Sequence, residues 1–379
     1  MSLKFIDLCC GIGGFHQALS KMDHECVLAC DIDKNCREIY EINYNVKPDV
    51  DLCKLDIESI PDFDILCAGF PCQPFSKAGS QSGFKDSRGN IFFDICKIID
   101  FHKPKYIILE NVRNLVSHDG GKTFNIILST LEDLNYDVKH IILNALYFSV
   151  PQHRERILIM CKRKDIGCIP ELPKFTKKRV SLESIIDKTN QVNNLTDKLN
   201  ASRIIWNDFL LILSDNKIHV PKFPIWTDIW DSDVSDKFYN MYKSTVNKNK
   251  QFFEDNSDIL QNWLEESRCN ELWKGSVRKL EWQTGTDNGT LDETLWSPRG
   301  SGIRAKKIDY SPTLVAMCSM IPIYGPYSRH LTPRECARLQ SFPESYILHK
   351  DPKVNYKQFG NAVNVKMISW CVSFLINWY

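Results

Sequence analysis

Short apolar runs alternate with amphipathic helical patterns over the first 160 residues of this 379-residue chain. The apolar runs are Phe5–Leu8, Cys26–Cys30, Asp64–Ala68, Tyr106–Leu109 and Ile157–Met160. Strands that alternate with helices form βαβ units, and the parallel sheet that results is covered by helices on both faces. The pattern therefore predicts an α/β domain with a mostly parallel, doubly wound sheet.

The length predicts a second, smaller domain, because a single hydrophobic core stops growing at about 250–300 residues. From about Lys162, Lys/Asn-rich loops weaken the periodicity. We interpret the tryptophans of this region as its core, with base stacking as the alternative. An apolar helix over 363–379 should return the chain to the first domain, which we expect at 1–170 and 345–379, with the second at 171–344. The seven tryptophans concerned are Trp206, Trp226, Trp230, Trp263, Trp273, Trp282 and Trp296.

The net charge of +1 hides a gradient along the chain. Residues 299–379 hold 11 Lys/Arg and 4 Asp/Glu, a balance of +7, which leaves −6 for residues 1–298. Such an asymmetry points to a nucleic-acid partner.

The fifteen cysteines argue for a reduced, intracellular protein. Their number is odd, and no paired C-x-x-C spacing marks a disulfide framework or a zinc site, so we expect no metal. The chain opens directly on a strand pattern and has no apolar run of about 18 residues, so we expect neither a signal peptide nor a membrane span.

A glycine-rich loop, Cys-Cys-Gly-Ile-Gly-Gly at residues 9–14, follows the first strand and opens a helix over 15–21. Such a turn lets backbone amides approach a ligand at a helix N-terminus. The next strand ends in Asp31-Ile32-Asp33, an acidic position that could accept hydrogen bonds from ribose hydroxyls. These residues leave NAD, FAD and S-adenosylmethionine open as cofactors, and a tight turn with a helix-capping acid as the structural alternative.

Cys72 stands in the segment Gly-Phe-Pro-Cys-Gln-Pro-Phe-Ser at residues 69–76, again after a strand. Pro71 and Pro74 fix φ on either side of it and hold the thiol in a rigid loop. This arrangement suits a nucleophile better than a core cysteine. A free thiol with a pKa of about 8.5 is mostly protonated at neutral pH, so a cation or a helix N-terminus would have to activate it.

Two further segments place charged groups at strand ends. Glu110 closes a buried run at the expected ligand-facing edge of the sheet, where desolvation would raise its pKa and make it a general acid; a helix N-cap is the alternative. Arg154 and Arg156 precede the last strand. At strand spacing they share a face and could converge on one oxyanion or phosphate, unless they are a solvated strand start.

In their order along the chain and in their residues, these four segments resemble the conserved motifs of the DNA cytosine-5 methyltransferases, most closely those of the bacterial modification-type enzymes. The resemblance covers about residues 3–165 and 299–370. It implies a Rossmann-like S-adenosylmethionine-dependent domain and a target-recognition domain in place of 171–344. Further matching blocks are Asp86–Phe93, Leu143–Ala145, Arg334–Pro343 and Gln358–Val363.

The resemblance also implies roles for the charged residues. Cys72 would attack C6 of a flipped-out cytosine, while Glu110 would protonate or hydrogen-bond N3. Arg156 would hold the cytosine O2, and Arg154 would position the Cys72 loop or the backbone nearby. The methyl group of S-adenosyl-L-methionine would go to C5, with S-adenosyl-L-homocysteine as product and no metal.

The family pattern places the cofactor against the loop after the first strand and the segment near residue 362. Three features depart from the common family residues: Cys9-Cys10 replaces Phe-Ala or Phe-Ser, Asp31 replaces Glu, and Ile32 replaces an aromatic residue. The expected cofactor residues are Asp7, Cys9, Gly11, Ile12, Gly13, Gly14, Asp31, Ile32, Asp56, Ile57, Pro71, Asn361, Ala362 and Val363.

The expected partner is double-stranded DNA of a specific sequence, bound by a monomer in the cytoplasm, or in a nucleus or viral host compartment if the source is not bacterial. A restriction–modification system is the expected context, with viral and regulatory roles as alternatives. Arg299 to Arg304 with Lys306 form a plausible phosphate or base-edge clamp, with a solvated basic loop as the alternative. Gln81 and Arg88 are further expected DNA contacts.

Three other functions compete with this interpretation. A tRNA cytosine methyltransferase would carry Pro-Pro-Cys-Gln and a Cys-Phe-Thr triplet, whereas Phe70 precedes Pro71 here and no such triplet occurs. A non-catalytic relative would have lost Cys72, Glu110 or Arg156. A nicotinamide-dependent dehydrogenase would leave these three residues without a joint role.

Overall fold

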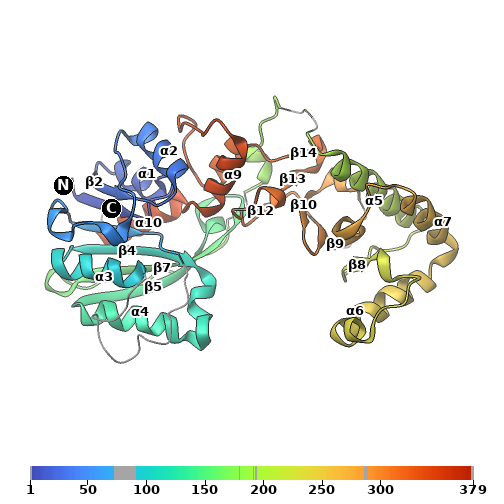
Figure 1. The fold of residues 1–379 in the computed structure, drawn as a ribbon, viewed down its shortest axis with the longest axis horizontal. Helices are drawn as coiled ribbons and strands as arrows, with labels where there is room; N and C mark the ends of the chain where they lie inside the picture. The colour runs from blue at the N-terminus through green and yellow to red at the C-terminus, as the bar shows by residue number, and fades with distance from the viewer. Residues whose placement is uncertain are drawn as a thin grey trace. The chain divides into compact units, whose positions relative to one another are not determined.

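The computed structural model describes residues 2–71, 91–178, 180–190, 192, 194–285 and 289–376. The chain divides into two compact units, coloured along the sequence in Figure 1. The first comprises Met1–Val180, Pro312–Ala316 and Pro333–Tyr379, and the second Ser181–Ser311 and Met317–Thr332. The return to the first unit thus comes at residue 333, before the expected 345. The reason is that helix α8 (Pro333–Leu339) and the turn after it pack on α9 (Pro352–Asn361), where Gln340 Nε2 donates to the Phe359 carbonyl at 2.7 Å.

The first unit is built on a six-stranded sheet of order β2-β1-β3-β4-β7-β5. Neighbouring strands pair in parallel from β2 to β4, whereas β7 is antiparallel to both β4 and β5. The predicted mostly parallel sheet is confirmed, with β7 as the exception. The strands are β1 (Lys4–Leu8), β2 (Glu25–Cys30), β3 (Ile65–Ala68), β4 (Tyr106–Val112), β5 (Tyr136–Asn144) and β7 (Glu155–Arg163).

Helices cover both faces of this sheet, as doubly wound α/β topology requires (Figure 1). Because side chains alternate along a strand, Ile6 and Leu8 of β1 join the core under α3 (Ile91–His102) and α4 (Lys122–Asp133). Phe5 points to the other face and meets His16 of α1 (Gly14–Ser20) edge to face. On that side α1 packs against α10 (Val365–Leu375), and α2 is Lys34–Tyr44.

In its described residues the second unit has its own six-stranded sheet, of order β14-β13-β10-β11-β9-β8, and three α-helices. Six of the seven tryptophans singled out above are buried, and Trp226 is half-buried. The interpretation of these six as core residues is confirmed. The elements are β8 (Ile225–Trp226), β9 (Lys279–Gln283), β10 (Leu295–Arg299), β11 (Gly302–Lys306), β13 (Ile323–Tyr324), β14 (Arg329–His330), α5 (Asp197–Asp215), α6 (Asp236–Glu254) and α7 (Ser257–Arg268).

The cysteines are described by their state in the structure. Fourteen of the fifteen cysteines lie in the described ranges, and all of them are free thiols. Within these ranges no three His, Cys, Asp or Glu side chains come together as a metal site. Nor is any helix there long and apolar enough to cross a membrane.

Candidate active site

A cavity of about 500 Å³ opens in the first unit where the strands end. Its wall contains the segments that follow β1, β2 and β3 and the last residues of β4, all at the carboxyl edge of the sheet. Open α/β sheets bind ligands at this edge, and the volume suits a nucleotide-sized molecule. Of the residues expected at the site, the wall includes Cys9, Gly11, Ile12, Gly14, Asp31, Ile32, Pro71, Glu110, Arg156, Asn361, Ala362 and Val363.

Close packing explains two of the glycines in the loop after β1. Gly13 has φ 79°, and a Cβ there would lie 2.2 Å from Cε2 of Tyr44. At Gly14 a Cβ would lie 2.4 Å from Cγ2 of Val363, which brings the C-terminal segment against the loop. These contacts leave no room for a side chain at either position, so Gly13 and Gly14 are required by the packing of the loop.

Asp31 ties the first and second strand ends together. Its Oδ2 accepts a hydrogen bond from the Gly11 amide and its Oδ1 one from the Asp33 amide, both at 2.8 Å. Burial raises the pKa of the Asp31 carboxyl despite these bonds. Ile32, next to it, is 79% exposed on the cavity wall. The end of β2 thus presents a fixed carboxyl acceptor, Asp31, next to an exposed apolar side chain, Ile32.

Several wall residues were missed by reasoning from the sequence. The segment 51–53 reaches the cavity because Asp49 bridges Cys30 at the end of β2, and Lys357 reaches Asp33 Oδ2 at 2.8 Å. The periodicity of the sequence predicts neither of these two long-range contacts. The other missed wall residues are Cys10, Phe15, Cys30, Cys36, Phe70, Ile91, Asn111, Val112, Gln358 and Gly360.

Among the described residues, five cysteines line this cavity. Burial raises the pKa of each, to about 12 for Cys30 and about 11 for Cys53. The thiols are therefore neutral at physiological pH and act as small, weakly polar wall groups. The remaining three are Cys9, Cys10 and Cys36.

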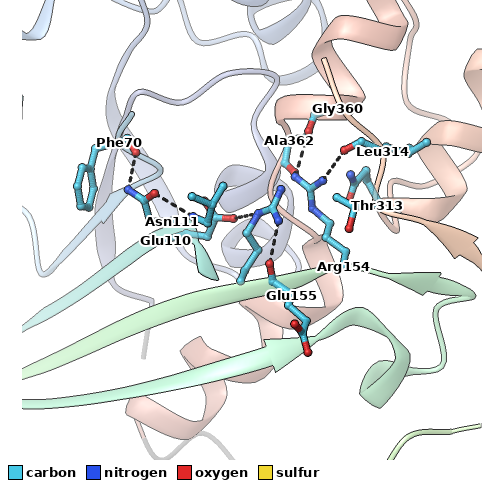
Figure 2. A network of polar contacts seen from close by, with 12 residues as sticks. Phe70, Glu110, Asn111, Arg154, Glu155, Thr313, Leu314, Gly360 and Ala362 are labelled. Carbon is cyan, nitrogen blue, oxygen red and sulfur yellow. Dashed lines mark hydrogen bonds and ion pairs between the residues drawn. The ribbon is translucent and has the colours of Figure 1, made fainter. Parts of the chain in front are cut away.

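Glu110, labelled in Figure 2, forms a largely buried ion pair with Arg156, and both residues line the cavity. The antiparallel register of β4 and β7 places Arg156 opposite Val112 and Glu110 opposite Leu158. Residues opposite each other share a face, so Glu110 and Arg156 are diagonal neighbours on one side of the sheet. Arg156 Nε lies 2.9 Å from Glu110 Oε1. This contact arises because β7 runs against β4.

The pKa of Glu110 is raised, because burial outweighs the attraction of Arg156 and Arg154. A carboxyl of this kind holds its proton at higher pH than an exposed one and can donate it. The N-cap alternative was wrong: Glu110 lies within β4, and Val112 precedes the short helix over Arg113–Gly121.

Arg154 is fully buried and holds backbone carbonyls (Figure 2). Its Nη1 donates to the Leu314 carbonyl at 3.0 Å, and its Nη2 to those of Gly360 at 3.2 Å and Ala362 at 2.7 Å. The expected convergence of Arg154 and Arg156 on one oxyanion was therefore wrong, because Arg154 lies before β7 and spends its Nη donors on these carbonyls. It fixes the segment that forms the far wall of the cavity.

Asn111 is a further residue that the sequence did not single out. Its side-chain amide donates to the Phe70 carbonyl at 2.9 Å, and its Oδ1 accepts from the Val112 amide at 2.8 Å (Figure 2). It thereby fixes the chain just before Cys72. Its place directly after Glu110 in the same apolar run was the only signal that could have pointed to it.

Four expected cofactor residues lie away from the cavity wall, and three expected residues cannot be placed. Asp7 is buried under α2, where Tyr40 donates to it at 3.4 Å, and Gly13 faces Tyr44. Asp56 and Ile57 begin a short helix after the 51–53 segment, which takes their expected place on the wall. Cys72, Gln81 and Arg88 lie outside the described residues.

The expected DNA contacts of the second unit form a β-hairpin rather than a flexible loop, with Arg299 paired to Gly302 across the turn. Arg304 Nε bonds Glu281 Oε2 at 2.5 Å, and Lys306 Nζ lies 2.9 Å from Asp309 Oδ1. Both cations already have acidic partners within this unit.

The family model for C-5 cytosine-specific DNA methylases matches residues 3–373. The chain belongs to this family. It is a DNA (cytosine-5-)-methyltransferase, as the resemblance of its motifs implied. The Type II methyltransferase M.HhaI of Haemophilus parahaemolyticus is 33% identical over 368 residues, 97% of this chain and 92% of the relative. M.HpaII of Haemophilus parainfluenzae is 33% identical over 375 residues, 96% and 86% of the two chains.

The fold of this methylase is also found among solved structures. A DNA modification methyltransferase encoded within an Escherichia coli prophage superposes with a TM-score of 0.58 at 17% identity, covering 99% of each chain. At this identity the likeness concerns the fold alone. The predicted α/β methyltransferase fold is confirmed.

Proposed function

We propose that this enzyme transfers the methyl group of S-adenosyl-L-methionine to C5 of a flipped-out cytosine in a specific double-stranded DNA sequence, through a covalent bond between Cys72 and C6. The observation that carries the proposal is the buried Glu110–Arg156 pair on the cavity wall. Pro71, which precedes Cys72 in the sequence, lies on the same wall. We therefore assign the nucleophile, the acid and the cation to one site.

The chemistry assigns each group a task. Cytosine C5 is a poor nucleophile, and attack of the Cys72 thiolate on C6 places electron density at C5. Glu110, with its raised pKa, gives or shares a proton at N3 and so stabilises the developing charge. Arg156 both orients Glu110 and offers N–H donors to the cytosine O2. After methyl transfer a base removes the C5 proton, and elimination frees Cys72.

The target cytosine must leave the duplex, because C6 and C5 of a stacked base are inaccessible to catalytic groups in a protein cavity. Flipping costs a few kcal/mol, which protein contacts to the DNA must offset. We assign this recognition to the second unit. We further propose that the enzyme acts as a monomer in the cytoplasm, within a restriction–modification system like its Type II relatives.

The residues of the cavity fit the proposed cofactor, which supplies the methyl group when bound. Asp31 presents a carboxyl acceptor suited to ribose hydroxyls, and the exposed Ile32 an apolar face suited to a purine. Asn361 to Val363, held by Arg154, would enclose the methionine end. An aspartate and an isoleucine thus offer the acceptor and the apolar surface for which other family members use a glutamate and an aromatic ring.

The test is bisulfite sequencing of DNA from a methylation-deficient host that expresses the enzyme. We expect 5-methylcytosine at one recurring sequence. Cys72→Ser should abolish methylation and leave DNA binding largely intact. Equal turnover by this variant would exclude the covalent route, and unmethylated DNA beside methylated tRNA would favour the RNA enzyme instead.

A further inference from the structure

Helix α6 of the second unit carries four lysines and, between its terminal Asp236 and Glu254, no acidic residue. Its neighbours have the opposite balance, since α5 holds two basic and three acidic residues and α7 one basic and three acidic. The unit as a whole has 18 Lys/Arg and 20 Asp/Glu. Positive charge is therefore concentrated on one helix of an acidic unit (α6 in Figure 1).

The orientation of α6 is fixed by a buried polar anchor. Asn249 Oδ1 accepts from the Trp226 amide at 2.7 Å and from Trp230 Nε1 at 3.2 Å, while its Nδ2 donates to the Pro224 carbonyl at 2.9 Å. Val246 and Phe253 are buried beside it. Because this side faces the tryptophan core, the opposite side of the helix faces outward. The backbone of α6 is kinked at Tyr242 (φ −123°, ψ 24°), so Asn249 fixes the part of the helix that carries Lys243, Lys248 and Lys250.

The outward side carries the lysines of the helix, the exposed Met241 and Tyr242, and one exposed carboxyl at each end, Asp236 and Glu254. Lys237, Lys243 and Lys248 are exposed, and Lys250 is half-buried. Exposed Asn240, Ser244 and Asn247 lie between them. None of the four lysines forms a salt bridge with a described residue, in contrast to Arg304 and Lys306 of the hairpin, which have acidic partners.

We propose that this basic face of α6, formed by Lys237, Lys243, Lys248 and the polar residues between them, contacts the backbone phosphates of duplex DNA. Ammonium groups that form no salt bridge with a described carboxylate, together with amide and hydroxyl donors, match phosphate oxygens, and the two carboxyls of the helix lie only at its ends. Such contacts do not read sequence but set the position of the protein on the duplex. The inference rests on the proposed function, since it takes duplex DNA as the substrate.

The experiment measures binding of the full-length enzyme to a duplex with its target site and to an unrelated duplex, across a series of salt concentrations. The slope of log K against log salt is negative, and each lost phosphate contact reduces its magnitude by about 0.9. The variant Lys237→Gln/Lys243→Gln/Lys248→Gln should therefore lose about 2 to 3 from the slope, and its Kd should rise at least tenfold at 0.1 M salt for both duplexes. Lys21→Gln/Lys47→Gln/Lys122→Gln, which removes three exposed lysines of the first unit, is the control for net charge.

The inference is overturned if the α6 variant changes the slope no more than the control does. It is also overturned if binding weakens only for the target duplex, or only for an RNA probe, because a phosphate contact acts on any duplex sequence. Failure of the proposed function would look different: wild-type enzyme would leave DNA unmethylated in parallel assays. If the triple variant loses folded structure by circular dichroism, Lys243→Gln alone should still lower the slope by about 0.9.

Discussion

Replacing Asp31 by Asn tests the corner that joins the loop after β1 to the end of β2. Each carboxylate oxygen of Asp31 now accepts one amide hydrogen bond at 2.8 Å. An asparagine can accept only one of them, and its NH₂ group then faces the other N–H. The change removes one charge-assisted bond, of about 2 kcal/mol.

Two measurements follow from this magnitude. For a domain of 150–250 residues, a loss of about 2 kcal/mol should lower the Tm by about 4–8 °C. If the same carboxylate binds the cofactor ribose, the Kd for S-adenosyl-L-homocysteine should rise about 30-fold, the equivalent of another 2 kcal/mol. Differential scanning fluorimetry and isothermal titration calorimetry give the two values independently.

A matched control is Asp64→Asn. Asp64 Oδ2 accepts from the Lys4 amide at 3.1 Å, and its Oδ1 pairs with Lys105 at 2.7 Å, outside the cavity wall. This variant should lower the Tm without weakening ligand binding. A Tm and a Kd of Asp31→Asn within error of wild type would refute the assignment, and a lowered Tm with unchanged Kd would limit Asp31 to a structural role.

Three further predictions concern the same unit. Glu110→Gln should lower kcat at least a hundredfold, and in the wild type kcat should fall as pH rises through the raised pKa of Glu110, because the protonated carboxyl is the active form; an unchanged pH profile in the variant would contradict this. Gly14→Ala places a methyl 2.4 Å from Val363 Cγ2 and should cost about 1–3 kcal/mol in chemical denaturation, with partial recovery on adding Val363→Ala. Burial raises the pKa of Asp7, so its stabilising proton is fully present below the unfolded-state pKa and lost as pH rises through the folded-state pKa; Asp7→Asn should raise the Tm at pH 8 but not at pH 4.

Much of the first unit followed from local patterns. The predicted runs match β1 to β4 and β7 closely. Short apolar stretches between glycines and helical patterns form buried strands in an α/β domain. The loop at 9–14, the acid at 31 and the carboxyl at 110 were found in the same way. Each is a short motif next to a strand, and the edge rule for parallel sheets brings such motifs together.

Long-range pairing decided the remainder. Only the antiparallel register of β7 explains why Arg156 meets Glu110, while Arg154 turns to carbonyls from residues 314, 360 and 362. Likewise, the bridge from Cys30 to Asp49 brings an unforeseen segment to the cavity. The periodicity of a sequence predicts which face of a helix or strand is buried, but it does not predict which distant element packs against that face.

The charge argument shows the same division. The sequence determined where basic residues are numerous, and pointed to residues 299–379. Only the tertiary structure decided which of these charges are neutralised: Arg304 by Glu281, Lys306 by Asp309 and Lys357 by Asp33. An ion pair depends on two residues meeting in space, so only the structure shows that the lysines of α6 form no salt bridge with a described residue. The sequence by itself determined the motifs and their chemistry, and the tertiary structure decided their partners.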